Sequence, residues 1–72
     1  MSSKNIIKKR GTVIEALPST NFKVELDSGE EVLAHLAGRL RIHRIRVLPG
    51  DKVIVEMTPF DNNRGRIIIR EK

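Results

Sequence analysis

Short stretches of alternating apolar and polar residues constrain the fold of this chain more than any other feature. Between residues 22 and 27 the apolar members are Phe22, Val24 and Leu26, and every residue between them is polar. Neighbouring side chains of a strand point to opposite faces, so this period of two predicts a strand with one buried face. Four further strands are predicted from alternation or β-branched residues, at positions 12–17, 32–36, 52–57 and 66–70.

Turn-forming residues separate these predicted strands. They gather at positions 18–21, 27–29 and 48–51, and residues 60–65 have the composition of a loop. After Gly38 the alternation stops, and Leu36 and Leu40 are spaced as on one face of a helical turn. The expected fold is all-β: a five-stranded OB-fold Greek-key barrel with a short helical turn between strands 3 and 4, whose closure removes the sheet edges.

Length limits the domain organisation. A chain of 72 residues is too short for two cores. Residues 1–5 are polar and aperiodic and are expected to form a flexible N-terminal tail, followed by a single OB-fold domain at 6–72. The chain has no cysteine and no apolar run as long as a membrane span or signal-peptide core. A cytoplasmic location is therefore expected.

Positive charge is concentrated in the second half of the chain. Lys and Arg number 14 against 9 Asp and Glu, for a net charge of +5. Residues 11–36 contain five acids and one base, whereas residues 39–46 contain four arginines and no acid. Such segregation predicts a face that binds a polyanion.

The candidate RNA-binding residues fall in two groups. The first comprises Arg39, Arg41, His43, Arg44 and Arg46, and the second comprises Arg64, Arg66 and Arg70. Guanidinium groups bind phosphate in a bidentate manner and stack on bases, which suits folded RNA. Gly65 is expected at a loop-to-strand junction where the backbone approaches a ligand, and Arg70 on the same face as Arg66. The alternative for the first group is a solvated face near a helical turn, and the alternative for the second is an ordinary hairpin loop, since such loops often carry glycine and a basic residue.

Metal binding, catalysis and aromatic stacking have little support in the sequence. His35 and His43 lack partners at metal-ligand spacing. The carboxylates Glu25, Asp27, Glu30 and Glu31 are expected on an outward strand face and a turn, as a solvated face. Neither a nucleophile elbow nor a nucleotide-binding loop is present. We therefore expect no catalytic residue, metal or cofactor. The two aromatic residues, Phe22 and Phe60, are too few for a stacking platform, and packing is the expected role of both.

Seven blocks of the chain resemble bacterial translation initiation factor one, in order and in spacing. They are Gly11-Thr12-Val13, Leu17-Pro18, Asn21-Phe22-Lys23-Val24, Gly38-Arg39-Leu40-Arg41, Ile45-Arg46-Val47-Leu48-Pro49-Gly50-Asp51, Thr58-Pro59-Phe60-Asp61 and Arg64-Gly65-Arg66-Ile67. The resemblance implies an S1-type OB barrel that binds the aminoacyl decoding site of the small ribosomal subunit. It further implies that the protein blocks premature tRNA entry and cooperates with initiation factors two and three.

The resemblance also implies site residues and partners. It assigns rRNA contacts to Arg39, Arg41, Arg46, Arg64, Arg66 and Arg70, and implies a neighbouring ribosomal protein as a further contact. Arg44 stands where the family frequently has an aromatic residue, so this chain lacks an aromatic ring there and has one more cation. The free protein is expected to be a monomer.

Two alternatives use the same fold. A general single-stranded-RNA chaperone or antiterminator would bind unstructured RNA as well as it binds small subunits. A protein-interaction module would present its basic face to an acidic partner, and its binding would survive nuclease treatment.

Overall fold

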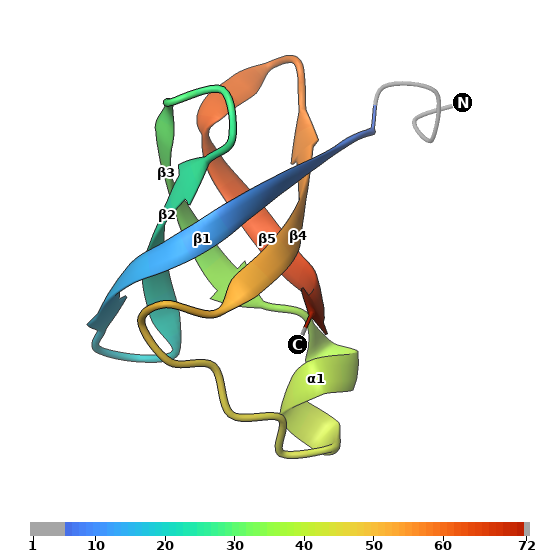
Figure 1. Cartoon of the computed structure of the whole chain (residues 1–72). Coiled ribbons are helices and arrows are strands. Elements are labelled where there is room, and N and C mark those ends of the chain that lie inside the picture. The colour runs from blue at the N-terminus through green and yellow to red at the C-terminus, as the bar shows by residue number, and fades with distance from the viewer. Residues whose placement is uncertain (1–5, 72) are drawn as a thin grey trace.

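The computed structural model of the chain describes residues 6–71, except for the side chains of Asp61 and Asn62. The predicted tail at positions 1–5 lies outside this range. The elements in chain order are β1 (Ile7–Leu17), β2 (Asn21–Leu26), β3 (Glu31–Leu36), α1 (Gly38–Ile42), β4 (Lys52–Thr58) and β5 (Asp61–Glu71). Figure 1 shows the strands wrapped around one another and α1 at one end of the barrel.

The five strands form a closed barrel in the order β1-β2-β3-β5-β4. Every neighbouring pair is antiparallel except β3 and β5, which run parallel. The predicted OB-fold barrel with a helical turn between strands 3 and 4 is thus confirmed. Within the described part of the chain, no helix is long and apolar enough to cross a membrane.

The core is built from the inward members of the alternating strands. Val24, Val53, Val55 and Ile67 are completely buried, and Leu40 brings α1 into the same cluster. Burial of such side chains contributes roughly 1.5–3 kcal/mol each relative to exposure. The helix is fastened further by a hydrogen bond from the Ala37 amide to the Ile67 carbonyl, 2.9 Å long. The barrel therefore determines where α1 lies.

Gly65 lies inside β5, so the predicted loop-to-strand junction at this position is wrong. Residues 61–65 belong to the strand because their backbone pairs with both β3 and β4. A Cβ atom at Gly65 would lie 2.3 Å from Cγ1 of Val55 and 2.9 Å from Cγ of Met57. The glycine allows close packing of two strands rather than close approach of a ligand.

A register shift in β5 also corrects the predicted faces of this strand. Val55 pairs with Ile67, whereas Ile54 pairs with Ile69, so Ile68 is an extra residue in the ladder. Such a bulge exchanges the faces of the residues that follow it. Ile67 is consequently buried and Ile69 half exposed, and the prediction that they share one side is wrong.

The same shift separates two predicted site residues. Arg66 pairs with Glu56 on the outer face, whereas Arg70 pairs with Val53, whose side chain is in the core. Directly opposite residues of an antiparallel pair share a face. Arg66 and Arg70 therefore do not lie on one face, contrary to the prediction.

Candidate nucleic-acid interface

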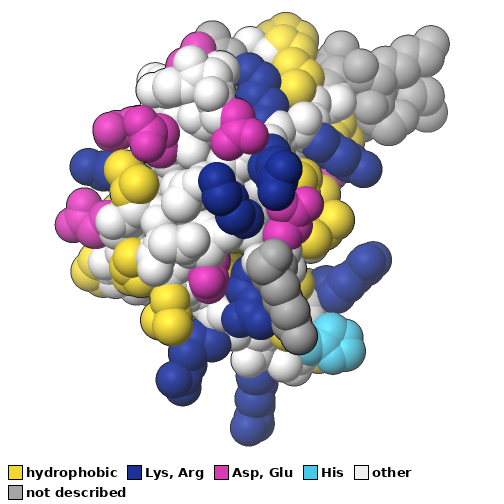
Figure 2. Space-filling view, in the orientation of Figure 1, with side chains coloured by type: hydrophobic (Ala, Val, Ile, Leu, Met, Phe, Trp, Pro, Cys, Tyr) yellow, Lys and Arg dark blue, Asp and Glu magenta, His cyan; other side chains and the backbone are white. Residues whose placement is uncertain are grey.

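The first predicted group surrounds α1. Arg39 and Arg41 belong to the helix, His43 is its C-cap, and Arg44 follows in a left-handed conformation with φ of 56°. The Ile45 amide donates a hydrogen bond to the Leu40 carbonyl over 2.9 Å, which turns the chain back toward the barrel. All four arginines and His43 are exposed. Figure 2 shows Lys and Arg side chains projecting around the end of the molecule where α1 lies.

The arginine side chains of this segment have no acidic partner. None of Arg39, Arg41, Arg44 and Arg46 forms an ion pair with another described residue. Leu40, buried on the inner side of α1, holds the helix while its arginines face solvent. An unpaired guanidinium keeps its full set of donors for a ligand. The segment can therefore bind several phosphates at once.

Arg70 has a different environment. Its Nη1 donates a hydrogen bond of 2.6 Å to the main-chain oxygen of Arg46. This bond joins the end of β5 to the segment that follows α1. Arg70 therefore helps to hold the arginine segment in place. Only the remaining N–H donors of its guanidinium group are available to a ligand.

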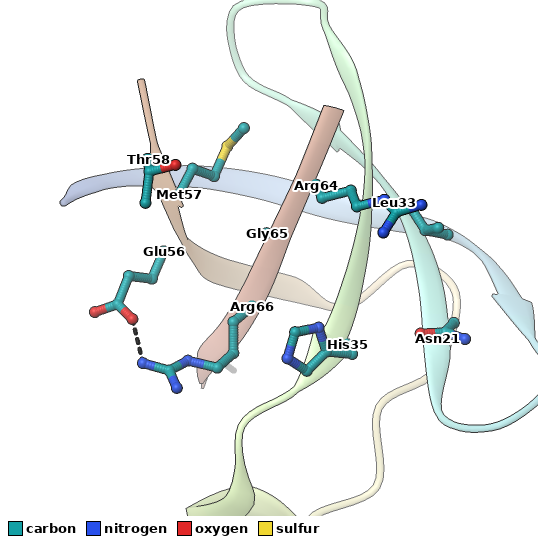
Figure 3. A pocket seen from close by; sticks show the side chains of 9 residues that line it. All are labelled: Asn21, Leu33, His35, Glu56, Met57, Thr58, Arg64, Gly65 and Arg66. Atoms are coloured by element: carbon teal, nitrogen blue, oxygen red, sulfur yellow. Dashed lines mark hydrogen bonds and ion pairs between the residues drawn. The ribbon is translucent and has the colours of Figure 1, made fainter. Parts of the chain in front are cut away.

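The second group lines a groove of about 590 Å³ on the outside of the barrel (Figure 3). The groove crosses β2, β3, β5 and β4 and is lined by Asn21, Leu33, His35, Glu56, Met57, Thr58, Arg64, Gly65 and Arg66. Arg64 makes no ion pair with a described residue, whereas Arg66 contacts Glu56 through Nη2 and Oε1. The groove thus contains one unpaired and one paired arginine.

The two predicted groups adjoin at Arg66. A second hollow of about 310 Å³ is lined by Ala37, Gly38, Arg39, Arg66 and Ile68. Arg66 borders both hollows and Arg39 borders the second. The structure therefore brings Arg39, Arg64 and Arg66 together along one surface, although 25 positions separate Arg39 from Arg64 in the chain.

Several groove residues were not predicted. Asn21, Leu33, His35 and Glu56 line the groove, and only the outward alternation of their strands hinted at exposure. Their proximity depends on register: Asn21 pairs with His35, His35 with Arg66, and Arg66 with Glu56. The apolar–polar pattern of one β-strand carries no information on which residues of neighbouring strands lie beside it.

Phe60 does not pack, contrary to the prediction. Thr58 pairs with Asp61, so Pro59 and Phe60 form the turn between β4 and β5. The ring is 84% exposed. Among the described residues, no three His, Asp or Glu side chains lie close enough to hold a metal ion.

The fold and the interface together define a class of protein. A closed five-stranded barrel with a groove over β2 and β3 and a set of unpaired arginines beside it is a nucleic-acid-binding OB-fold. The family model for Translation initiation factor 1A / IF-1 matches residues 3–72. The chain therefore belongs to this family of translation initiation factors, which are RNA-binding OB-fold proteins and not enzymes.

Solved structures similar to the chain include two that illustrate the match. One is the solution structure of translation initiation factor one from the Wolbachia endosymbiont strain TRS of Brugia malayi, with 40% identity and a TM-score of 0.77 over 97% of this chain and 83% of that one. The other is the crystal structure of YjeQ from Thermotoga maritima, with 28% identity and a TM-score of 0.73 over 92% of this chain. The match spans only 23% of that second protein. The resemblance predicted from the sequence is confirmed.

Proposed function

We propose that this initiation factor binds the small ribosomal subunit at the aminoacyl decoding site through rRNA contacts, and blocks premature entry of tRNA there. Residues 6–72 act as one RNA-binding domain, and the free protein is a cytoplasmic monomer. Initiation factors two and three cooperate with it, and a neighbouring ribosomal protein borders its site. The rRNA contacts are Arg39, Arg41, His43, Arg44, Arg46, Arg64, Arg66 and Arg70.

The observation that carries this proposal is the exposed arginine segment around α1. Four guanidinium groups lie within eight residues, and none is neutralised by a described carboxylate. Held apart on a short helix and its C-terminal turn, they present donors in several directions. Folded RNA offers phosphates in several directions, because its backbone bends around loops and bulges.

Shape and charge favour folded RNA over unstructured strands. Proteins that bind single strands without sequence preference stack successive bases on a row of aromatic rings. Here one exposed aromatic side chain, Phe60, is present among the described residues. Electrostatic contacts must therefore supply most of the affinity, and these weaken with salt because bound counterions are released.

Co-sedimentation with purified small ribosomal subunits tests the proposal. We expect saturable, equimolar binding that weakens as salt is raised, and little binding to large subunits or to an unstructured RNA. Equal binding to all three would contradict the proposal and support a general RNA chaperone. Binding that survives nuclease digestion of the subunit would instead favour recognition of an acidic protein.

A single arginine of α1 provides the sharper test. Arg41→Ala should weaken subunit binding by roughly tenfold, since a hydrogen bond to a charged group contributes about 1.5 kcal/mol or more. Its circular dichroism spectrum should not change, because the side chain is exposed. Arg10→Ala is the matched control: it removes the same charge from β1, where the guanidinium is already paired with Glu71 at 2.8 Å. Equal losses in the two variants would indicate a nonspecific effect of net charge.

A further inference from the structure

We infer that Glu56 is a positioning residue that makes Arg66 a contact for base edges rather than for phosphates. The inference rests on the proposed function and assigns a role within the groove of Figure 3. It concerns a carboxylate of β4 that the predicted binding residues did not include.

The geometry singles out Glu56 as the partner of Arg66. The two residues face each other directly across β4 and β5, and Nη2 of Arg66 contacts Oε1 of Glu56. The Glu56 side chain is 19% exposed and that of Arg66 49% exposed. Lys8 is the register partner of Glu56 on the other side, in β1, but makes no ion pair with it. The more buried carboxylate therefore anchors the more exposed guanidinium.

This pairing changes what Arg66 can bind. A guanidinium group has five N–H donors, of which the contact with Glu56 occupies one, so the others remain available to the groove. The positive charge is offset at close range by a carboxylate that solvent screens only in part. A phosphate that approached Arg66 would also approach Glu56, and the two anions would repel each other. Arg64 makes no ion pair with a described residue and attracts phosphate without this penalty.

The surroundings of the pair suit a base edge. In register order the groove presents Asn21, His35, Arg66 and Glu56 on four adjacent strands. Figure 3 shows Arg66 between Glu56 and His35. Adjacent strands are about 4.8 Å apart, so the row places a donor (Arg66), an acceptor (Glu56) and two side chains that can do both (Asn21 and His35) at close, fixed intervals. An unstacked base displays both donors and acceptors along its edges, whereas a phosphate displays acceptors alone.

The salt dependence of binding tests the inference. For each variant, the affinity for small ribosomal subunits is measured by co-sedimentation over a series of salt concentrations, with an unstructured RNA as competitor. Arg64→Ala should reduce the slope of log affinity against log salt by about 0.7 to 0.9, the loss of one phosphate contact. Arg66→Ala should weaken binding while leaving that slope near the wild-type value.

Neutralising the carboxylate should have the opposite effect. Glu56→Gln releases Arg66 as a full cation, so the salt slope should become steeper by up to about one unit. Binding to the unstructured RNA should rise several-fold, and the preference for the small subunit should fall. Glu56→Asp retains the negative charge and should retain part of the preference for the small subunit. A role of Glu56 in stability alone would not predict this difference between the Gln and the Asp variant.

Several outcomes separate the inference from the proposed function. Unchanged slope and unchanged preference in Glu56→Gln would overturn the inference, as would equal slope losses in Arg64→Ala and Arg66→Ala. If Glu56→Gln fails to fold, the comparison of the two arginine variants decides the question. Absence of saturable binding by the wild-type protein would overturn the proposed function itself.

Discussion

At the scale of residues, the arginine side chains of the interface have different roles because the barrel gives them different neighbours. Arg66 is paired with Glu56, and Arg70 is bound to a main-chain oxygen, whereas Arg41 and Arg64 have no acidic partner among the described residues. The pairing of Arg66 lowers its attraction for phosphate, and the hydrogen bond of Arg70 restricts its orientation. The arginines of the interface are therefore not interchangeable, although the sequence alone predicted the same role for all of them.

Gly65 and Gly38 are likewise identical residues with different neighbours, and substitution by alanine should affect stability differently at the two positions. Gly65→Ala would place a methyl group against Val55 and Met57, and overpacking of this kind costs about 1–3 kcal/mol. For a domain of this size, the melting temperature should fall by roughly 7–20 °C in a thermal unfolding scan.

The control is Gly38→Ala at the first residue of α1. A Cβ atom there would have no neighbour within 4 Å, and alanine is favoured over glycine in a helix by about 0.5–1 kcal/mol. This variant should melt at the same temperature as the wild type or a few degrees higher. A greater loss of stability in Gly38→Ala than in Gly65→Ala would contradict the assignment of Gly65 to strand packing.

At the scale of elements, α1 depends on the barrel for its existence. The helix has five residues, and no side chain caps its N-terminus. Isolated helices of this length do not form in water, because nucleation is unfavourable. Leu40 and the segment returning through Ile45 and Val47 hold it against the core. The arginines around it are therefore positioned by apolar packing.

Leu40→Ala should expose this dependence. Removal of the buried side chain should lower the free energy of unfolding by about 2–3 kcal/mol. Amide hydrogens at positions 40–45 should then exchange faster with solvent, and subunit binding should weaken although every arginine is retained. Ile42→Ala is the control, because Ile42 belongs to the same helix but is 78% exposed. Similar exchange rates in the two variants would show that α1 does not need its anchor.

At the scale of the whole molecule, β5 closes the barrel. It pairs in parallel with β3 and antiparallel with β4, and it supplies the buried Ile67. Without β5, two strand edges would be unpaired and the apolar faces of the other strands would be exposed to water. The barrel is therefore expected to fold as a single unit.

Truncation tests this cooperativity. A chain ending at residue 60 should lack the circular dichroism of a folded barrel and should not bind small subunits. The full chain should unfold in one transition, with the same midpoint by circular dichroism and by amide exchange, as small single domains usually do. A folded truncated chain, or two separate transitions, would contradict the dependence on β5.

Much of this architecture could be predicted from local sequence. Alternation in β2, β3 and β4 predicted which face is buried, because the side-chain period of a strand is a property of the backbone. The exposed arginines of residues 39–46 were also predictable from the absence of interspersed acids. These features depend only on residues close together in the chain.

Other features arise only from contacts between distant segments. The ladder with β3 and β4 extends β5 through residues predicted as loop, and its bulge at Ile68 moves Arg70 away from the face of Arg66. The contact of Glu56 with Arg66 and the position of Arg39 beside Arg66 likewise require the closed barrel. Backbone hydrogen bonds between strands select the register, and the composition of each strand alone does not. The basic character of the interface is therefore present in the sequence, whereas the groove and the separate roles of its arginines are created by the tertiary structure.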